Sequence, residues 1–214
     1  MAHAADDTPA RELSAQLARI VDELCDTFHG VFGRETVQRF VDETYTLLDE
    51  HATVRTFLPT LTARFAKQRL TDHGRAQGLT RVTVPQVLFI CVHNVGRSQL
   101  AAALLDYHAF GKITVRSAGS QPQGTIPQTI VDALAEVGIP LAQAFPKPLT
   151  DEVVRAADVV VTMGCGDACP VYPGKRYLDW AIDDPTDRPL AEVRAIRDEI
   201  DRDVRVLLSE LLGD

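Results

Sequence analysis

The sequence predicts an α/β fold in which a four-stranded, mostly parallel sheet is flanked by helices and preceded by a small three-helix α domain. In the first 70 residues, apolar side chains recur at three- and four-residue steps, which is typical of amphipathic helices. After Pro85, short apolar runs rich in β-forming residues alternate with helical patterns, which is typical of a parallel sheet covered on both faces. We therefore expect two domains, residues 1–80 and residues 85–214.

The N-terminal domain is predicted from helical spacing alone. Three helices are expected, over Ala10–Phe28, around Val37–Leu48 and from Leu58 to about Leu70, the last with Pro59 near its first turn. The polar, glycine-containing stretch from Thr71 to Gly78 is predicted to be a linker. Because three short helices bury little surface on their own, we expect this domain to pack against a second copy or against the rest of the chain, and we favour a dimerisation domain as the simpler hypothesis.

The elements of the C-terminal domain follow from the alternating pattern. Four strands are predicted: Val87–Ile90, Ile113–Val115 with its ending at Ser117-Ala118-Gly119, Asp158–Thr162 and Lys175–Leu178. Three helices are predicted, over Arg97–Phe110, Ile126–Val137 and Leu190–Leu212. The last helix has one continuous apolar stripe opposite a face of Asp and Arg residues, so one side of it should pack on the sheet.

Composition narrows the range of functions. No apolar run approaches the roughly 20 residues that a bilayer-spanning helix needs, and the acidic N-terminus lacks the order of a secretory signal, so we expect a cytoplasmic protein. The formal net charge of -8 argues against general nucleic-acid binding. Four cysteines are too few and too unevenly spaced for a disulfide framework, so each is expected to begin as a thiol.

The segment from Cys91 to Ser98 carries the strongest functional signal. A predicted strand ends at Cys91 and a predicted helix begins at Arg97, so the backbone N–H groups of the turn between them, in which Gly96 permits a tight loop, converge on one point. These groups and the helix dipole attract a tetrahedral oxyanion, and the Arg97 guanidinium can hold two of its oxygens. The positive potential of these N–H groups, the helix dipole and Arg97 also favours the thiolate form of Cys91, which is the nucleophilic form. The predicted oxyanion-binding residues are Val92, His93, Asn94, Val95, Gly96, Arg97 and Ser98.

These residues resemble the low-molecular-weight protein tyrosine phosphatases and their arsenate reductase relatives. The resemblance covers about residues 85–214 and rests on Cys91, Asn94, Arg97 and Ser98, on Ser117-Ala118-Gly119 and on Asp184-Pro185. It implies that Asn94, Ser98 and Ser117 brace the loop, and that Ser98 also donates a hydrogen bond to the Cys91 thiolate. It implies further that Asp184, favoured over its neighbour Asp183, supplies a proton to the leaving oxygen. A raised pKa of the Asp184 carboxyl would suit that role.

The loop alone does not distinguish arsenate from phosphate, because the two anions have similar shape and charge; phosphate and sulfate are therefore expected competitors. Arsenate reduction needs a second thiol, and the segment around Cys165 and Cys169 resembles the redox segment of arsenate reductases. Phosphatases of this family commonly place aromatic residues after the Asp-Pro pair, whereas Thr186 and Asp187 stand here. We therefore predict thiol-dependent reduction of arsenate to arsenite, an arsenic detoxification. The predicted catalytic residues are Cys91, Arg97, Asp184, Cys165 and Cys169.

Three interpretations of Cys165 and Cys169 stay open: a relay that ends in a disulfide between them, inert thiols, or metal ligands, of which the metal site is least favoured. No tightly bound cofactor is expected. A relay would take electrons from thioredoxin. If both thiols are inert, mycothiol or glutathione would react at Cys91 instead, with a mycoredoxin- or glutaredoxin-like partner. The helical extension resembles the dimerisation module of some actinobacterial arsenate reductases. The alternative functions are a low-molecular-weight tyrosine phosphatase and a non-enzymatic oxyanion or redox sensor.

Other residues have two interpretations each. His93 either tunes the thiolate or faces solvent. Cys25, beside the apolar stripe of the first helix, is expected in the core. Tyr172, Tyr177 and Trp180 either rim the site or pack at the sheet edge.

Overall fold

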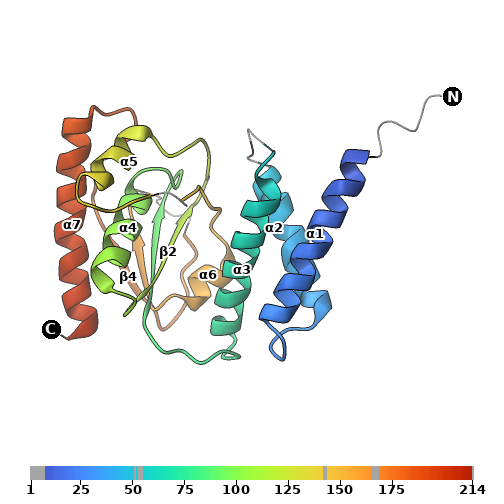
Figure 1. Cartoon of the computed structure of the whole chain (residues 1–214). Coiled ribbons are helices and arrows are strands. Elements are labelled where there is room, and N and C mark those ends of the chain that lie inside the picture. The colour runs from blue at the N-terminus through green and yellow to red at the C-terminus, as the bar shows by residue number, and fades with distance from the viewer. Residues whose placement is uncertain (1–7, 51, 53–54, 142–143, 165–168, 214) are drawn as a thin grey trace. The chain divides into compact units, whose positions relative to one another are not determined.

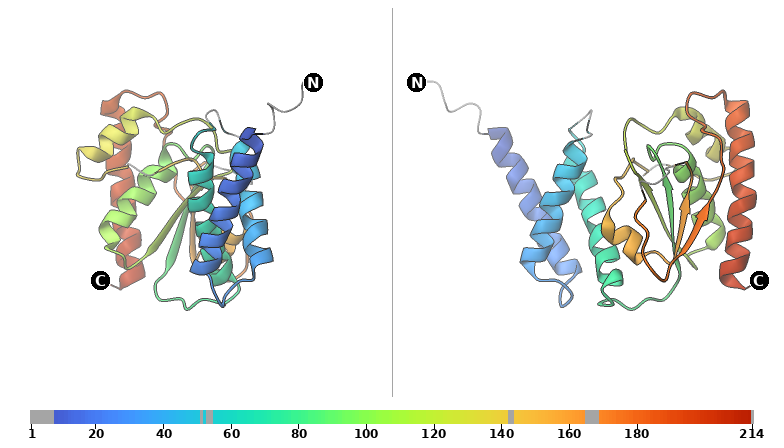
Figure 2. Two further views of the ribbon diagram at one scale, coloured as in Figure 1. Left: turned by 45° about the vertical axis from the view of Figure 1, so that its right-hand side comes forward. Right: turned by 180° about the vertical axis from the view of Figure 1, so that it is seen from behind.

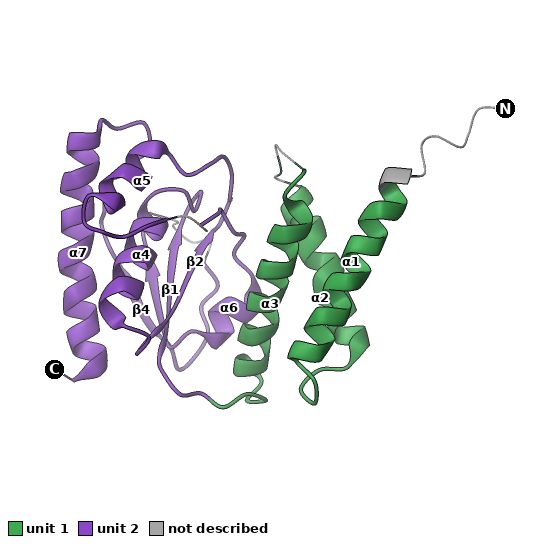
Figure 3. Ribbon diagram, viewed as in Figure 1, with its two compact units in different colours: residues 1–81 green, residues 82–214 purple. Residues whose placement is uncertain are grey.

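The structure is a computed structural model that describes residues 8–50, 52, 55–141, 144–164 and 169–213 (Figure 1). The chain divides into two compact units, residues 1–81 and residues 82–214, each with its own hydrophobic core (Figure 3). Within these described ranges, no helix combines the length and the apolar character needed to cross a membrane.

Unit 1 consists of three helices, as the sequence predicts. They are α1 (Thr8–Thr27), α2 (Arg34–Asp49) and α3 (Leu58–Ala76). Their core is apolar and contains Ile20, Val21, Leu24, Phe28, Val37, Phe40, Val41, Ala66 and Leu70, with Cys25 half-buried against it. Arg69 is buried beneath this layer, where its guanidinium lies 4.9 Å from the centre of the Phe40 ring and donates to the Thr44 hydroxyl. The helices are thus joined by apolar contacts and by the buried polar contact between Arg69 and Thr44.

The predicted linker over Thr71–Gly78 is wrong for most of its length, because α3 continues to Ala76. Asp72 and Gly74 are buried in this last part of the helix. A methyl group on Gly74 would lie 3.0 Å from Thr80 Cγ2 and 3.4 Å from the Phe32 ring. The glycine that suggested a flexible linker therefore provides room for close packing.

Unit 2 contains a four-stranded sheet, which confirms the predicted α/β fold. The strands are β1 (Gln86–Cys91), β2 (Thr114–Gly119), β3 (Val159–Thr162) and β4 (Arg176–Asp179). Their order is β2-β1-β3-β4, and every pair is parallel. Strand β2 ends at Gly119, in the predicted ending Ser117-Ala118-Gly119, and Gly119 pairs with Cys91 at the end of β1.

Helices cover both faces of this sheet. Alternate residues of β1 point in opposite directions, so Phe89 and Cys91 join the core beneath α4 (Arg97–Ala109), α5 (Gln128–Ala135) and α7 (Leu190–Leu212). Leu88 and Ile90 join the core beneath α6 (Asp151–Ala156). Figure 2 shows α7 and α6 on opposite sides of the strands. The pattern did not predict α6, because six residues are too few for a helical repeat to stand out.

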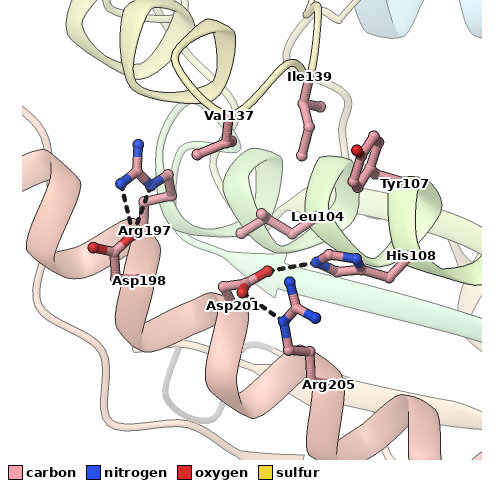
Figure 4. A pocket seen from close by; sticks show the side chains of 9 residues that line it. All are labelled: Leu104, Tyr107, His108, Val137, Ile139, Arg197, Asp198, Asp201 and Arg205. Carbon is pink, nitrogen blue, oxygen red and sulfur yellow. Dashed lines mark hydrogen bonds and ion pairs between the residues drawn. The ribbon is translucent and has the colours of Figure 1, made fainter.

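The packing of α4 against α7 includes a cavity of about 220 Å³ (Figure 4). Its apolar wall contains Leu104, Val137 and Ile139. On its polar side, the His108 ring lies 2.6 Å from the Asp201 carboxylate, which also accepts a hydrogen bond from Arg205. This cluster ties the end of α4 farthest from Cys91 to the middle of α7.

Candidate active site

Cys91 lies where the central strand β1 ends and the loop to α4 begins. Its side chain is 3% exposed, and its sulfur is 2.9 Å from the Ser98 hydroxyl and 3.3 Å from the backbone nitrogen of Asn94, which donates to it. A shallow pocket opens beside the sulfur. Its lining residues are Cys91, His93, Val95, Gly96, Arg97, Asp184 and Thr186. The larger cavity between α4 and α7 has no thiol in its lining, so Cys91 marks the smaller pocket as the candidate site.

The carbonyl groups at the start of the Cys91 loop accept hydrogen bonds from a neighbouring segment of the chain. Three backbone hydrogen bonds come from the segment after β2: Ser120 N–H to Cys91 O, Gln121 N–H to Val92 O and Gln123 N–H to His93 O, at 3.1, 2.8 and 3.4 Å. In a trans peptide the N–H points away from the C=O. The N–H groups of residues 92–94 therefore point away from residues 120–123, and that of Asn94 donates to the Cys91 sulfur at 3.3 Å. This is the arrangement that an oxyanion cradle requires.

Asn94 is the centre of a buried network beneath the loop. Its backbone is left-handed, with φ 56°, a conformation that asparagine tolerates better than most residues. Its side-chain amide donates to Ser98 Oγ at 2.7 Å, and its Oδ1 accepts from Lys147 N–H at 2.9 Å and from the Gln99 amide at 3.2 Å. Because Ser98 accepts from Asn94, its own proton is directed to the Cys91 sulfur. Asn94 and Ser98, the residues predicted to brace the loop, are thus joined by a buried hydrogen bond next to the Cys91 sulfur.

Two glycines allow other segments to approach the loop closely. A methyl group on Gly119 would lie 2.8 Å from the carbonyl oxygen of Val92, and one on Gly96 would lie 2.9 Å from Pro185 Cγ. Gly96 has φ -122°, so it makes room for Pro185 rather than providing a left-handed turn. The proline next to Asp184 is therefore seated directly on the loop.

Arg97 is the first residue of α4, and its guanidinium is 12% exposed. Nη1 donates to the carbonyl oxygen of Ile182 at 3.3 Å, and Nη2 donates to Asp184 Oδ2 at 3.0 Å. Gly164, with φ +72°, lies on another side of the guanidinium, because a methyl group there would be 2.6 Å from Nη1. The segment after β3 and the segment before α7 therefore both contact the predicted oxyanion-binding side chain.

Asp184, not Asp183, faces this pocket. Burial raises the pKa of the Asp184 carboxyl, but hydrogen bonds from Thr186 and the charges of Arg97 and His93 outweigh burial and hold that pKa below its usual value. The expected raised pKa is thus wrong for this arrangement, since the carboxylate accepts the Thr186 N–H at 3.0 Å as well as the Arg97 guanidinium. Asp183 is exposed, and no ion pair of its side chain is found among the described residues.

The other predicted residues lie in different surroundings. His93 is half-buried and lines the pocket. Ser117 is buried in β2, but within the described chain its hydroxyl makes no hydrogen bond to the loop. On this side, the loop is contacted by Gly119 and by the residues that follow it, 120–123. Cys165 lies outside the described residues. Cys169 packs in the core on the α6 side of the sheet, whereas Cys91 belongs to the core on the α4 side.

Gln99 and Gly164 contact the site although no sequence pattern assigned them a role, and Gly119 was known only as part of the Ser117-Ala118-Gly119 motif. Gln99 is 3% exposed, and its amide donates to the carbonyl oxygens of Asn94 and Phe145 at 2.9 and 3.2 Å. A polar residue two positions after Arg97, within an apolar helix, was the available signal. Nowhere in the described ranges do three or more His, Cys, Asp or Glu side chains form a group that could hold a metal ion.

Of the two interpretations of Tyr172, Tyr177 and Trp180, the structure agrees with packing on the sheet. Tyr172 and Tyr177 join the core on the α6 side, and the Trp180 ring lies 5.6 Å from the ring of Phe89 on the other side. None of the three lines the pocket beside Cys91.

The chain matches two protein families. Residues 17–72 match the N-terminal domain of protein-tyrosine-phosphatase-like proteins, and residues 86–214 match the low molecular weight phosphotyrosine protein phosphatases. Among solved structures, a thioredoxin-dependent arsenate reductase of Corynebacterium glutamicum is 48% identical, with a TM-score of 0.84 over 92% of this chain and 98% of that chain. An arginine phosphatase from Geobacillus stearothermophilus is 27% identical, with a TM-score of 0.53 over 60% of this chain and 94% of that chain. By sequence, arsenate reductase 1 of Staphylococcus epidermidis is 36% identical over 118 residues, which are 53% of this chain and 88% of that protein.

Proposed function

Because the chain belongs to the low molecular weight phosphotyrosine protein phosphatase family, we propose that it uses the Cys91 loop for the reaction of its arsenate reductase relatives, the reduction of arsenate to arsenite. The observation that carries the proposal is the position of the Cys91 sulfur, which accepts hydrogen bonds from Asn94 N–H and Ser98 in a loop whose carbonyl groups are turned toward residues 120–123. These donors stabilise a thiolate, and the amides of the loop bind an oxyanion above it.

The first chemical step joins Cys91 to arsenic. Arg97 turns from Asp184 to two oxygens of the bound arsenate, and the Cys91 thiolate attacks the arsenic atom. An As–S bond forms, and one arsenate oxygen leaves as water after taking a proton from Asp184. The negative charge of the anion, and the loss of the Arg97 contact, raise the pKa of Asp184 toward the range in which it holds that proton.

The second step is the reduction itself. A second thiolate attacks the Cys91 sulfur, an S–S bond forms, and the electron pair of the As–S bond stays on arsenic, which leaves as arsenite. Cys169 lies on the other side of the sheet from Cys91, which favours the assignment of this attack to Cys165 or to an external thiol. Cys169 then forms a disulfide with Cys165 and releases Cys91. In sum, two thiols lose two electrons while arsenate becomes arsenite and water.

The reductant and the assembly are part of the same proposal. We assign thioredoxin as the reductant, because the similar structure that covers 92% of this chain is named for its dependence on thioredoxin; mycothiol with mycoredoxin is the alternative. We also propose a cytoplasmic homodimer that acts in arsenic resistance, with unit 1 as the dimerisation module. Light scattering on the full chain tests the dimer, and a monomer at micromolar concentration would contradict it.

The test of the reaction is arsenite production from arsenate by the full chain. Thioredoxin with its reductase and a mycothiol–mycoredoxin system are run in parallel. Cys91→Ser should abolish turnover, whereas Cys25→Ser, which removes a thiol from unit 1, should leave it unchanged. Turnover that survives in Cys91→Ser would sink the proposed mechanism.

A phosphatase is the second candidate, because the family is named for that activity and an arginine phosphatase shares the fold. The same loop holds phosphate, and water would replace the second thiol. Hydrolysis of p-nitrophenyl phosphate without added thiol, combined with no arsenite in either reductant system, would favour the phosphatase.

A further inference from the structure

Tyr177 lies next to Cys169 on the α6 side of the sheet. It is a residue of β4 paired with Val160 of β3, and its ring packs in the same core as Cys169 and Tyr172. Its hydroxyl accepts a hydrogen bond from the Tyr172 N–H at 2.9 Å and donates one to the carbonyl oxygen of Pro170 at 3.2 Å. One side chain therefore closes the turn that directly follows Cys169.

The carbonyl group of Pro170 links this turn to the thiol. The Cys169 sulfur lies 3.8 Å from the same oxygen and donates to it, so this oxygen accepts from both Cys169 and Tyr177. Burial, and to a smaller extent the nearby charge of Cys169, raises the pKa of Tyr177, so its phenol stays protonated and keeps donating at neutral pH. When Cys169 loses its proton, its own contact with the carbonyl is lost and the contact of Tyr177 remains.

The other end of the turn is held by α6. The Arg155 guanidinium lies 4.3 Å from the centre of the Tyr172 ring. Lys175, two residues before Tyr177, donates to the carbonyl oxygens of Arg155 and Ala157 at 2.5 and 2.6 Å. Tyr172 and Lys175 are thus held against the end of α6, while Tyr177 closes the turn that begins at Pro170.

We propose that Tyr177 is a positioning residue for Cys169: its hydroxyl holds the Pro170–Tyr172 turn so that the Cys169 thiolate is presented for disulfide exchange. This inference rests on the proposed function, because it requires Cys169 to take part in the relay. In the step concerned, Cys169 gives its proton to water and forms an S–S bond with Cys165, and the departing Cys91 sulfur takes the electron pair.

The test compares Tyr177→Phe with Tyr172→Phe in the full chain. Tyr177→Phe keeps the ring and removes both hydroxyl hydrogen bonds. Tyr172→Phe removes a hydroxyl for which no hydrogen bond is found in the described ranges, and keeps the backbone N–H and the ring beside Arg155. Each protein receives one equivalent of arsenate without a reductant, and the Cys165–Cys169 disulfide is quantified over time by peptide mass spectrometry.

We expect Tyr177→Phe to slow formation of this disulfide about fivefold, as for the loss of about 1 kcal/mol of hydrogen bonding, and Tyr172→Phe to match the wild type. The affinity for inorganic phosphate, measured by calorimetry, should be the same in all three proteins, because the Cys91 loop is untouched. Equal rates of disulfide formation would overturn the inference, as would a parallel loss of phosphate affinity, which indicates a general structural defect. Absence of arsenite from the wild type would instead refute the proposed function, before any Tyr177 variant is compared.

Discussion

Arg97 and Asp184 are separated by 87 residues in the sequence, yet the guanidinium donates to the carboxylate at 3.0 Å. Arg97 opens α4, and Asp184 lies in the segment between β4 and α7. An oxyanion held by the loop would bind the same guanidinium. The carboxylate and the oxyanion therefore compete for one cation, and the carboxylate is the group proposed to act as the acid.

Asp184→Asn should have opposite effects on the affinity for phosphate and on the turnover of arsenate. The substitution removes the competing charge, so the affinity for inorganic phosphate should rise about two- to fivefold, the effect of a partly exposed ion pair of up to about 1 kcal/mol. Turnover of arsenate should fall about 100-fold, because the proton donor is lost. Calorimetry and the thioredoxin-coupled assay measure the two effects. Asp183→Asn is the control and should change neither; weaker phosphate binding in Asp184→Asn would argue against competition.

Gly164→Ala should impair the oxyanion site through Arg97. Its methyl group would lie 2.6 Å from Nη1, so the guanidinium must move. Displacement of a charge-assisted contact should lower phosphate affinity about tenfold. Gly174→Ala is the matched control, because Gly174 has a similar φ of +78° but nothing within 4 Å of the added methyl group. Both variants should lose about 1 kcal/mol of stability from backbone strain, and only Gly164→Ala should bind phosphate more weakly.

Asn94 should contribute both hydrogen bonds and a tolerated left-handed backbone. Asn94→Gly keeps the backbone conformation and loses the buried side-chain contacts, which should cost about 2 kcal/mol of unfolding free energy. Asn94→Ala loses the same contacts and adds strain at φ 56°, so it should be about 1 kcal/mol less stable than Asn94→Gly. Urea unfolding followed by the fluorescence of Trp180, the single tryptophan, reports on unit 2. Equal stability of the two variants would show that the conformation carries no strain.

The contact between Asp201 and His108 should make stability depend on pH in the acidic range. Burial raises the pKa of the Asp201 carboxyl, but hydrogen bonds from Arg205 and His108 outweigh burial and lower it overall. A carboxyl whose pKa is lower in the folded state stabilises the fold above its unfolded pKa of about 3.9, and this contribution is lost as pH falls through the folded pKa. Asp201→Asn should therefore be less stable than the wild type, by about 1 kcal/mol, between pH 5 and pH 7.

This difference should shrink as the pH falls below about 4. Asp203→Asn provides the control, because within the described residues Asp203, two positions along α7, has no ion pair. Unfolding by urea at a series of pH values, again followed by Trp180, gives both curves. A difference that is the same at pH 3 and at pH 7 would contradict the assignment.

Contiguous patterns in the sequence predicted the main elements. The strand that ends in Cys91, the loop and the start of α4 lie within a dozen consecutive residues, so periodicity and motif coincide there. The apolar stripe of α7 is equally local, and its predicted bounds are those of the structure. Where local signals conflicted, the prediction failed: the end of α3 has the polar and glycine content of a linker, and only its burial shows why it is a helix.

By itself, the sequence determined the fold class and the position of the Cys91–Ser98 loop between a strand and a helix, and it predicted a nucleophile and an oxyanion site there, because each depends on neighbouring residues whose geometry the backbone dictates. Only the tertiary structure decided what surrounds that loop. It placed Gly164 and Asp184 against Arg97, Gln99 beneath Asn94, and Cys169 on the far side of the sheet from Cys91. It also reversed the expected shift of the Asp184 pKa. Contacts between segments many residues apart leave no periodic trace in the sequence, and the strength of a charge interaction depends on distance and burial, which exist only once the chain is folded.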